Sequence, residues 1–293
     1  MATPDGASDA NKYVIDIESG AETARLVEQD KLLTRAMGGL FPEQPDLPSG
    51  KRVLDVACGP GGWAIEVAFT YSPQVEVVGI DLNQTMIEYA RAVAWSRGLN
   101  NVTFTVMDAK QPLAFEEHSF DIVNARFIFS FMDQAAWPAL LAECQRVLRP
   151  GGLIRLTEFD TVVSNSASWQ RIQEYLYQAM ARQRRTFSVD KRSVGVVHML
   201  KKLLQDAGFD QVERRPFIID SSYGADLHHI SCKDAEVGFA LVKPYLIKSG
   251  VAEETTYDAT YQQMLIDMLG EDFISLGFGV TTWAIKPGEE VLR

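Results

Sequence analysis

Short apolar runs alternate with helical patterns along the first half of the chain. Runs rich in Val, Ile and Leu fall at 53–58, 75–82, 102–109, 120–129 and 152–159. The segments between them carry apolar residues at helical spacing. Continuous apolar strands separated by helices are typical of a parallel sheet covered on both faces. The pattern therefore predicts a Rossmann-like, doubly wound α/β core.

The second half of the chain carries longer helical patterns. Helices are expected at 167–183 and 191–208, and a helical stretch at about 227–269. Strands are expected at 211–220 and 277–287, which brings the predicted sheet to seven, mostly parallel, strands with helices on both faces. A further helix is expected at 21–37, ahead of the first strand, and ends at two glycines.

The charge balance weighs against polyanionic partners. The chain has 28 Lys and Arg against 39 Asp and Glu, a formal net charge of −11. Because nucleic-acid binding depends largely on neutralising phosphates, we expect no nucleic-acid partner. One basic run, 181–192, is either a solvated helix face with its loop or a docking site for an acidic substrate.

Neither a metal site nor a membrane span is indicated. The three cysteines, Cys58, Cys144 and Cys232, are widely separated, and the four histidines form no His-Glu-x-x-His motif. No apolar stretch is long enough to cross a bilayer, and the first residues lack the basic and apolar parts of a signal peptide. We therefore expect a cytoplasmic enzyme without a metal, and a homo-oligomer is compatible with the sequence.

The most specific local signal is a glycine-rich loop. Asp55 is followed by Val-Ala-Cys-Gly-Pro-Gly-Gly at 56–62, directly after a predicted strand and before a predicted helix. Gly59 and Gly61 lack a Cβ, so the backbone can turn sharply and a ligand can approach the helix N-terminus. Glycines are also common in plain strand-to-helix turns, so the loop alone does not decide between the two interpretations.

Two acidic residues favour a nucleoside ligand. Asp81 ends the second predicted strand and can hydrogen-bond both hydroxyls of a ribose. Asp108 ends the third and can accept from an adenine amine, with the Ala109 amide beside it. Each could instead be a helix cap. Together with the glycine loop, however, they follow three neighbouring strands, at the edge where open α/β sheets bind ligands.

The loop suits an amino acid linked to adenosine better than a dinucleotide. A pyrophosphate loop reads Gly-x-Gly-x-x-Gly, whereas this one reads Gly-Pro-Gly-Gly-Trp, with Trp63 and Glu66 crowding the helix start. Asp55 is well placed for an ammonium group and poorly placed for a diphosphate. The residues therefore favour an α-amino acid linked to adenosine over a dinucleotide.

Five segments in order resemble the motifs of class I S-adenosylmethionine-dependent methyltransferases. They are VLDVACGPGGW at 53–63, GIDL at 79–82, MDA at 107–109, FDIV at 120–123 and RVLRPGGLIRLTEF at 146–159. The subgroup that they resemble contains the ubiquinone/menaquinone-methyltransferase-like and LaeA-like small-molecule enzymes. The resemblance covers about 13–159 and, more loosely, 200–287.

The resemblance implies a set of residues that bind S-adenosylmethionine and its product S-adenosylhomocysteine. It implies Asp55, Gly59 and Gly61 around the methionine moiety, Asp81 on the ribose, Leu82 and Met86 against the adenine ring, Asp108 and Ala109 at its edge, and Asn124 near the transferred methyl. Ala57 stands where the family usually has its first glycine, which matters if that residue needs a positive φ. Tyr13 and Arg25 belong to a segment that folds over the cofactor in related enzymes.

The resemblance also implies three parts of the chain. Residues 1–50 form an N-terminal helical segment over the cofactor site, and 51–160 form the cofactor-binding core. Residues 161–293 complete the sheet and carry helical substrate-cap insertions at about 161–200 and 225–272, rich in aromatic residues and methionine. Such a helical stripe can equally be ordinary core. As a cap, it predicts a small, largely apolar substrate and a role in secondary metabolism.

Substrate and catalytic residues are the least defined. Arg126 is either a substrate anchor or the partner of a surface carboxylate, and Phe127 and Tyr245 are candidate substrate contacts. Glu158 and His229 are candidate bases, with an ion pair in the fold and an exposed histidine as the alternatives. Methyl transfer depends mainly on aligning nucleophile, methyl and sulfur.

The chain is thus predicted to be an S-adenosylmethionine-dependent methyltransferase that acts on O, N or C of a small molecule. Three alternatives remain at the level of sequence. They are a non-catalytic relative that kept the cofactor site, an NAD(P)-dependent oxidoreductase, which the absence of a Tyr-x-x-x-Lys pair disfavours, and a protein methyltransferase.

Overall fold

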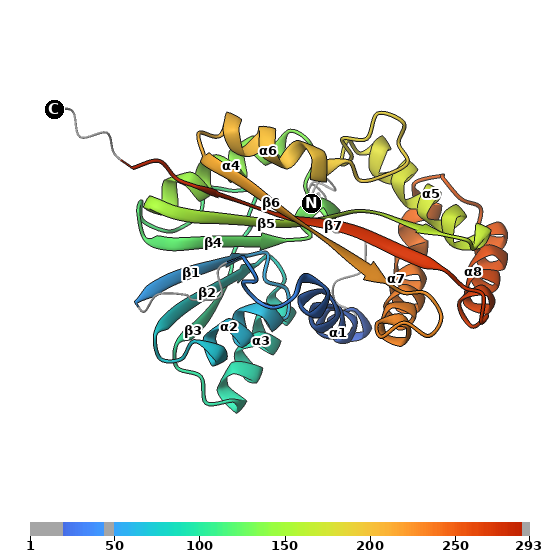
Figure 1. The fold of residues 1–293 in the computed structure, drawn as a ribbon, viewed down its shortest axis with the longest axis horizontal. Helices are drawn as coiled ribbons and strands as arrows, with labels where there is room; N and C mark the ends of the chain where they lie inside the picture. Colours follow the sequence, from blue (N-terminus) through green and yellow to red (C-terminus); the bar gives the residue numbers. More distant parts are fainter. Residues whose placement is uncertain (1–19, 44–49, 289–293) are drawn as a thin grey trace, which may run out of the picture.

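A single seven-stranded sheet organises the molecule (Figure 1). The computed structural model describes residues 20–43 and 50–288. The strand order is β3-β2-β1-β4-β5-β7-β6, with β1 to β5 parallel and β7 antiparallel to both β5 and β6. The strands are β1 (Lys51–Val56), β2 (Val75–Asp81), β3 (Val102–Val106), β4 (Phe120–Arg126), β5 (Leu148–Ser164), β6 (Asp210–Asp220) and β7 (Ser275–Ile285). The predicted doubly wound, mostly parallel sheet is confirmed.

Successive residues of each central strand contribute to two separate apolar layers, one on each face of the sheet. Val53 and Val77 pack with α2 (Gly62–Thr70) and α3 (Gln84–Ser96) on one face. Their neighbours Leu54 and Val78 pack with α4 (Ala136–Val147) and α6 (Val196–Asp206) on the other. Because successive side chains of a strand point to opposite faces, a run of consecutive apolar residues is what a sheet covered on both sides requires.

The remaining helices lie beyond the carboxyl ends of the parallel strands. They are α1 (Gly20–Met37), α5 (Ala167–Arg182), α7 (His228–Lys248) and α8 (Glu254–Met268). Trp169 of α5 packs with Phe239 of α7, and Tyr257 of α8 completes this third apolar cluster. Helix α1, far away in sequence, lies alongside α7 (Figure 1). We refer to α1, α5, α7 and α8 together as the helical cap.

Several element boundaries differ from the sequence prediction, and three of the differences change the shape of the cap or the sheet beneath it. The helix predicted at 191–208 begins only at Val196, because Gly195 in the left-handed region (φ 70°) precedes it. The single stretch predicted at about 227–269 is two helices, separated by a turn through Gly250 (φ 66°). Strand β5 extends to Ser164 rather than 159, since it pairs with β7 as far as Ser275. This extension carries the sheet under the helical cap.

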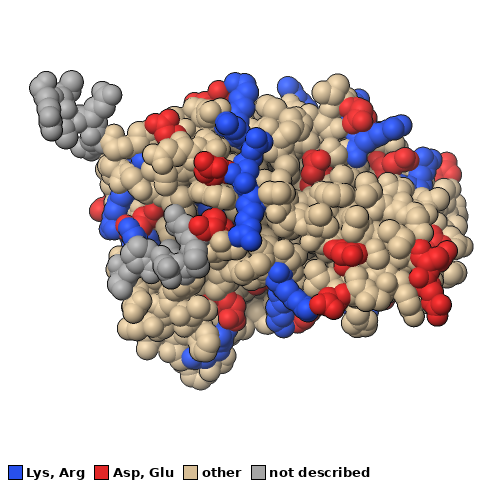
Figure 2. Space-filling view, in the orientation of Figure 1, with Lys and Arg blue, Asp and Glu red and all other residues tan. Residues whose placement is uncertain are grey.

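On the face drawn in Figure 2, acidic and basic side chains are interspersed among uncharged ones. Within residues 20–43 and 50–288, no helix combines the length and the apolar character that crossing a membrane demands.

Candidate functional site

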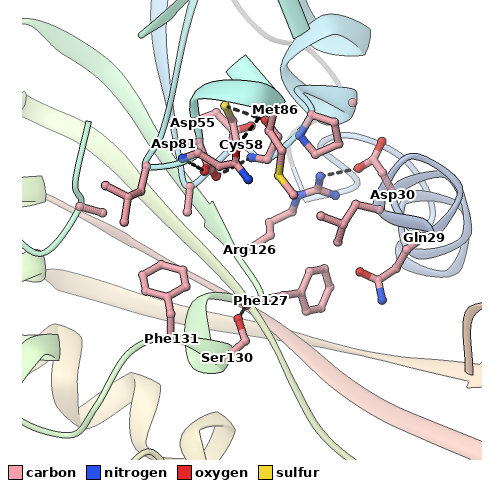
Figure 3. A pocket seen from close by; sticks show the side chains of 18 of the residues that line it. Gln29, Asp30, Asp55, Cys58, Asp81, Met86, Arg126, Phe127, Ser130 and Phe131 are labelled. Carbon is pink, nitrogen blue, oxygen red and sulfur yellow. Dashed lines mark hydrogen bonds and ion pairs between the residues drawn. The ribbon is translucent and has the colours of Figure 1, made fainter. Parts of the chain in front are cut away.

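A cavity of about 720 Å³ opens where β1, β2 and β4 end, between the sheet edge and helix α1 (Figure 3). Its walls bring together eleven of the residues singled out from the sequence. They are Asp55, Ala57, Gly59, Asp81, Leu82, Met86, Asp108, Ala109, Arg126, Phe127 and Tyr245. The sheet topology explains this meeting, because parallel strands deliver their carboxyl ends to one edge.

The glycine loop has the left-handed turns that its composition suggested. Gly59 (φ 54°) borders the cavity, and a Cβ there would meet no atom closer than about 4.0 Å. Gly61 (φ 79°) lies behind the loop, where a Cβ would come within 2.8 Å of Ala90 and 2.9 Å of Phe104. Ala57 also has a positive φ of 56°, so the alanine adopts a conformation that glycine would adopt without strain. The loop thus combines one open glycine with one that is enclosed.

Asp81 holds the loop and faces the cavity at the same time. One of its carboxylate oxygens accepts from the Gly59 amide at 2.9 Å and the other from the Asn83 amide at 2.8 Å. Burial raises the pKa of Asp81, while these two amides act in the opposite direction. A carboxylate offers about four lone pairs, so two remain for ribose hydroxyls.

Asp55 is the inner end of a buried polar row. Strand register places Asp55 of β1 beside Asn124 of β4, and Asn124 beside Arg155 of β5. The Asn124 amide donates to Asp55 at 2.7 Å, Arg155 donates to Asn124 at 2.9 Å, and Arg155 pairs with Glu43. Asn124 therefore lies behind the cavity and orients Asp55, which itself borders the cavity.

Burial raises the pKa of Asp55 to about 7, against the opposing effects of the Arg126 charge and the Asn124 hydrogen bond. A bound ammonium group would stabilise the ionised form. The site thus offers a carboxylate that a cationic ligand would complete, which is the chemistry of an α-amino acid. Together with the ribose-facing Asp81 and the open Gly59, these donors and acceptors fit S-adenosylmethionine.

Arg126 connects the sheet edge to helix α1. Its guanidinium forms an ion pair with Asp30 and donates to Thr34 at 3.4 Å, and both charged side chains are largely buried (Figure 3). The partner is a carboxylate, as one of the two sequence interpretations held, but it lines the cavity rather than the surface. Asp30 is not predicted from the sequence. Its position on the same face of α1 as the apolar residues Leu26 and Leu33 is the pattern that could have indicated a buried polar role.

A second, more apolar cavity of about 280 Å³ adjoins the first. Both are bordered by Gln29, Leu33, Phe127 and Ser130. Its other walls come from α1, α5, α7 and parts of β5, β6 and β7. Helix α7 borders both cavities, since Asp234 and Val242 face the second and Tyr245 faces the first. The two cavities and the wall between them therefore form one composite site.

The wall between the cavities rests on a buried carboxyl group. Phe127 has φ 56° and precedes the short 3-10 helix Ile128–Ser130. Glu158 is fully buried and accepts from the Ile128 amide at 3.0 Å and from the Phe129 amide at 3.4 Å. Burial raises the pKa of Glu158 well above its usual range. The structure thus places Glu158 behind the Phe127 turn, outside the lining of both cavities.

The structure places the other predicted residues away from the first cavity. Arg25 borders the second cavity, where it pairs with Glu22 and Asp234. His229 is exposed at the start of α7. Tyr13 lies outside the described residues. In the described part of the chain, no group of three His, Cys, Asp or Glu side chains is arranged to hold a metal ion.

Comparisons with known proteins agree with this geometry. Residues 53–152 match the methyltransferase domain family. The chain is 30% identical to a demethylmenaquinone methyltransferase of Listeria welshimeri over 198 residues, which cover 64% of this chain and 80% of that enzyme. It is 39% identical to aklanonic acid methyltransferase DauC of a Streptomyces species over 121 residues, or 41% of this chain and 54% of that enzyme. It spans about half of the length of several curated relatives that it matches.

Among solved structures, phosphoethanolamine N-methyltransferase 2 of Haemonchus contortus in complex with S-adenosyl-L-methionine aligns with 97% of this chain and 61% of its own. The TM-score is 0.58 at 20% sequence identity, a likeness of fold. The sequence match over most of the Listeria enzyme, the domain match across the glycine loop and the shared fold lead to one assignment. The chain belongs to the family of S-adenosylmethionine-dependent methyltransferases, with S-adenosylmethionine as its cofactor.

Proposed function

We propose that this protein transfers a methyl group from S-adenosylmethionine to an O, N or C atom of a small, largely apolar molecule. The single observation that carries this proposal is the pair of adjoining cavities that share the Phe127 wall. One cavity has the polar groups for the cofactor, and the other is lined mainly by apolar side chains. The demethylmenaquinone methyltransferase relative supports an apolar acceptor, and the aklanonic acid methyltransferase relative favours a role in secondary metabolism.

In this proposal, each polar group that borders the first cavity has a role in holding the cofactor. Asp55 would take the ammonium group, Asp81 the ribose hydroxyls, and Asp108 with Ala109 the adenine edge, while Leu82 and Met86 pack against the ring. The Asp30–Arg126 pair closes the cavity on the α1 side. When bound, S-adenosylmethionine supplies an electrophilic methyl group on a positively charged sulfur.

The chain's own contribution to the reaction is mainly alignment. Phe127 and Ser130 border both cavities, so they limit the path along which an acceptor atom can approach the methyl group. Asp234 is the one carboxylate that borders the second cavity within the described residues, and it is paired with Arg25. Orientation and the exclusion of water therefore account for catalysis in this proposal, rather than a dedicated histidine base.

Four further features belong to the same proposal. They are the cytoplasmic location, a homo-oligomeric assembly, the lack of a nucleic-acid partner, and the division into an N-terminal segment (1–50), a core (51–160) and a cap-bearing remainder (161–293). The packing of α1 against α7 and of α5 against α8 supports the cap as a unit.

A labelled-methyl assay tests the function. The protein is incubated with S-adenosylmethionine carrying an isotopically labelled methyl group and a panel of naphthols, quinols and polyketide phenols, and products are read by mass spectrometry. We expect label in at least one acceptor, together with an equal amount of S-adenosylhomocysteine, and loss of both with Asp81→Ala. Tight binding of the cofactor without label transfer to any acceptor would instead favour a non-catalytic relative.

A further inference from the structure

The second cavity contains very few charged groups. Among its lining residues, only Arg25, Asp234 and Tyr177 have titratable side chains, and the remainder are mostly aliphatic and aromatic. An acceptor that binds there loses its hydration shell. Any charge that it carries therefore needs an oppositely charged or hydrogen-bonding partner on the cavity walls. The charge state of Arg25 and Asp234 therefore decides which acceptors the cavity admits.

Arg25 is already neutralised. Its Nε donates to Glu22 at 2.7 Å and one terminal nitrogen donates to the same carboxylate at 2.8 Å. The other terminal nitrogen donates to Asp234 at 2.7 Å. The Glu22 side chain is fully buried and that of Arg25 is 8% exposed. Each guanidinium nitrogen thus serves a carboxylate, and Arg25 is not positioned to bind an anionic acceptor.

The cavity side of this cluster is a carboxylate, because Asp234 borders the second cavity and the fully buried Glu22 does not. Asp234 borders the cavity with 24% of its side chain exposed, and it accepts two further hydrogen bonds from Gln29 at 3.2 and 3.1 Å. An anion in this poorly hydrated cavity would approach the Asp234 carboxylate, and Arg25, the one cation among the described lining residues, is already paired.

One neutral polar group remains available. The Ser231 hydroxyl borders the cavity, is buried, and has no hydrogen-bond partner among the described residues. Ser231, Asp234, Gly238 and Val242 lie on one face of α7, so the cavity extends along roughly 16 Å of that helix. Buried hydroxyls are normally paired, so an unpaired one in a cavity wall points to a ligand that supplies the partner.

We propose that the acceptor is an uncharged, elongated apolar molecule with a hydroxyl or carbonyl group that pairs with Ser231, and that Asp234 excludes acceptors carrying a carboxylate or phosphate. This inference rests on the proposed function, since it treats the second cavity as the acceptor site. Asp234 acts in it as a specificity-determining residue, through its charge and through the neutralisation of Arg25.

Two probes with the same ring system test the inference. Protein saturated with S-adenosylhomocysteine is titrated at neutral pH with 2-naphthol and with 2-naphthoate, and binding is followed by calorimetry. We expect wild type to bind the naphthol at least about tenfold more tightly than the naphthoate. Asp234→Asn should reduce that preference at least about fivefold by strengthening naphthoate binding. Asp226→Asn, which removes an exposed carboxylate just before α7, should leave the preference unchanged.

The outcomes separate this inference from the function on which it rests. Equal or tighter binding of naphthoate by wild type would overturn it, as would an unchanged preference in Asp234→Asn with an unaltered melting temperature. Failure of both probes to bind while S-adenosylhomocysteine binds would show that the second cavity does not take such acceptors. Failure of S-adenosylhomocysteine itself to bind would instead refute the cofactor site.

Discussion

The two walls of the composite site are built in different ways. On the sheet side, Asp55 and Asp81 stand at the ends of hydrogen-bonded strands, and Asp55 is aligned with Asn124 by the register of β1 and β4. On the cap side, α1 and α7 are joined through side chains, by the Arg25–Asp234 pair and by hydrogen bonds from Gln29 to Asp234. The cofactor wall is thus fixed by backbone pairing, and the acceptor wall by contacts that single substitutions can change.

This difference explains how one fold serves many acceptors. The residues assigned to the cofactor cannot move without disturbing several strands, whereas cap residues can be replaced without altering the sheet. Substitutions on the sheet side should therefore affect stability and cofactor binding together. Substitutions on the cap side should change acceptor preference with little loss of stability.

The two glycines of the loop provide the largest expected effect. Gly61→Ala places a Cβ within 2.8 Å of Ala90 in a left-handed conformation, so the free energy of unfolding should fall by about 3 kcal/mol. Gly59→Ala meets no close atom and points toward the cavity, so it should cost about 1 kcal/mol of stability while weakening S-adenosylhomocysteine binding. Denaturant unfolding measures the stability of each variant, and calorimetry measures its binding of S-adenosylhomocysteine. Similar stability losses in the two variants would contradict the packing described.

Asp55 should be costly for stability and necessary for binding. Its folded pKa of about 7 lies above its ordinary value of 3.8, so between these values the folded protein holds a proton that the unfolded chain has lost. Its contribution to the free energy of unfolding therefore falls as pH rises from about 4 to 7 and is constant above. Asp55→Asn should remove this decline and be roughly 2 kcal/mol more stable than wild type at pH 8.

The same substitution should weaken cofactor binding. Because Asp55 must ionise to hold an ammonium group, wild type should bind S-adenosylhomocysteine more tightly as pH rises from about 6 to 8. Asp55→Asn should bind at least about tenfold more weakly at pH 8. Urea unfolding and calorimetry across this pH range give both results, and a variant that is less stable than wild type at pH 8 would show that the buried charge is not a cost.

The Asp30–Arg126 pair should couple the two walls. Both side chains are largely buried, so removing either one leaves an uncompensated charge. We expect Asp30→Asn and Arg126→Gln each to lower the free energy of unfolding by about 1 to 2 kcal/mol, and the double variant to lose less than the sum. A double-mutant cycle measures the coupling. The exposed pair Lys202–Asp206 serves as a control and should give less than about 0.5 kcal/mol.

Glu158→Gln should have the smallest effect. Glu158 supports the Phe127 turn through two amides, and a glutamine retains one acceptor oxygen, so a loss of about 1 kcal/mol in stability is expected. Because Glu158 borders neither cavity, kcat should stay within about threefold of wild type in the labelled-methyl assay. A loss of a hundredfold or more with an intact fold would restore Glu158 as a base.

The sequence was a good guide to the sheet side of the molecule. Strand periodicity and the glycine loop predict the order of elements, because buried parallel strands leave uninterrupted apolar runs. The positions of Asp55, Asp81 and Asp108 follow from the same reasoning, since parallel strands end at one edge. Ala57 stands at a position where a positive φ is expected if glycine is usual there, and the structure gives it one.

The cap side could not be predicted in the same way. Its residues meet through helix packing between segments distant in sequence, and the apolar spacing of α7 does not reveal that Asp234 contacts Arg25. The sequence pattern also does not predict the break between α7 and α8, because the spacing of apolar residues continues across the turn at Gly250. Glu158 looked like an edge residue from its strand position, and only the fold shows it buried behind the Phe127 turn.

Calorimetric titration with S-adenosylhomocysteine tests the central assignment most directly. Wild type, Asp81→Ala and Asp226→Asn are titrated with S-adenosylmethionine, S-adenosylhomocysteine and, as a control, NADH. We predict micromolar binding of both sulfur ligands by wild type and Asp226→Asn, binding at least about tenfold weaker by Asp81→Ala, and no binding of NADH. Well-folded wild-type protein that binds neither sulfur ligand, or that binds NADH in their place, would contradict the account.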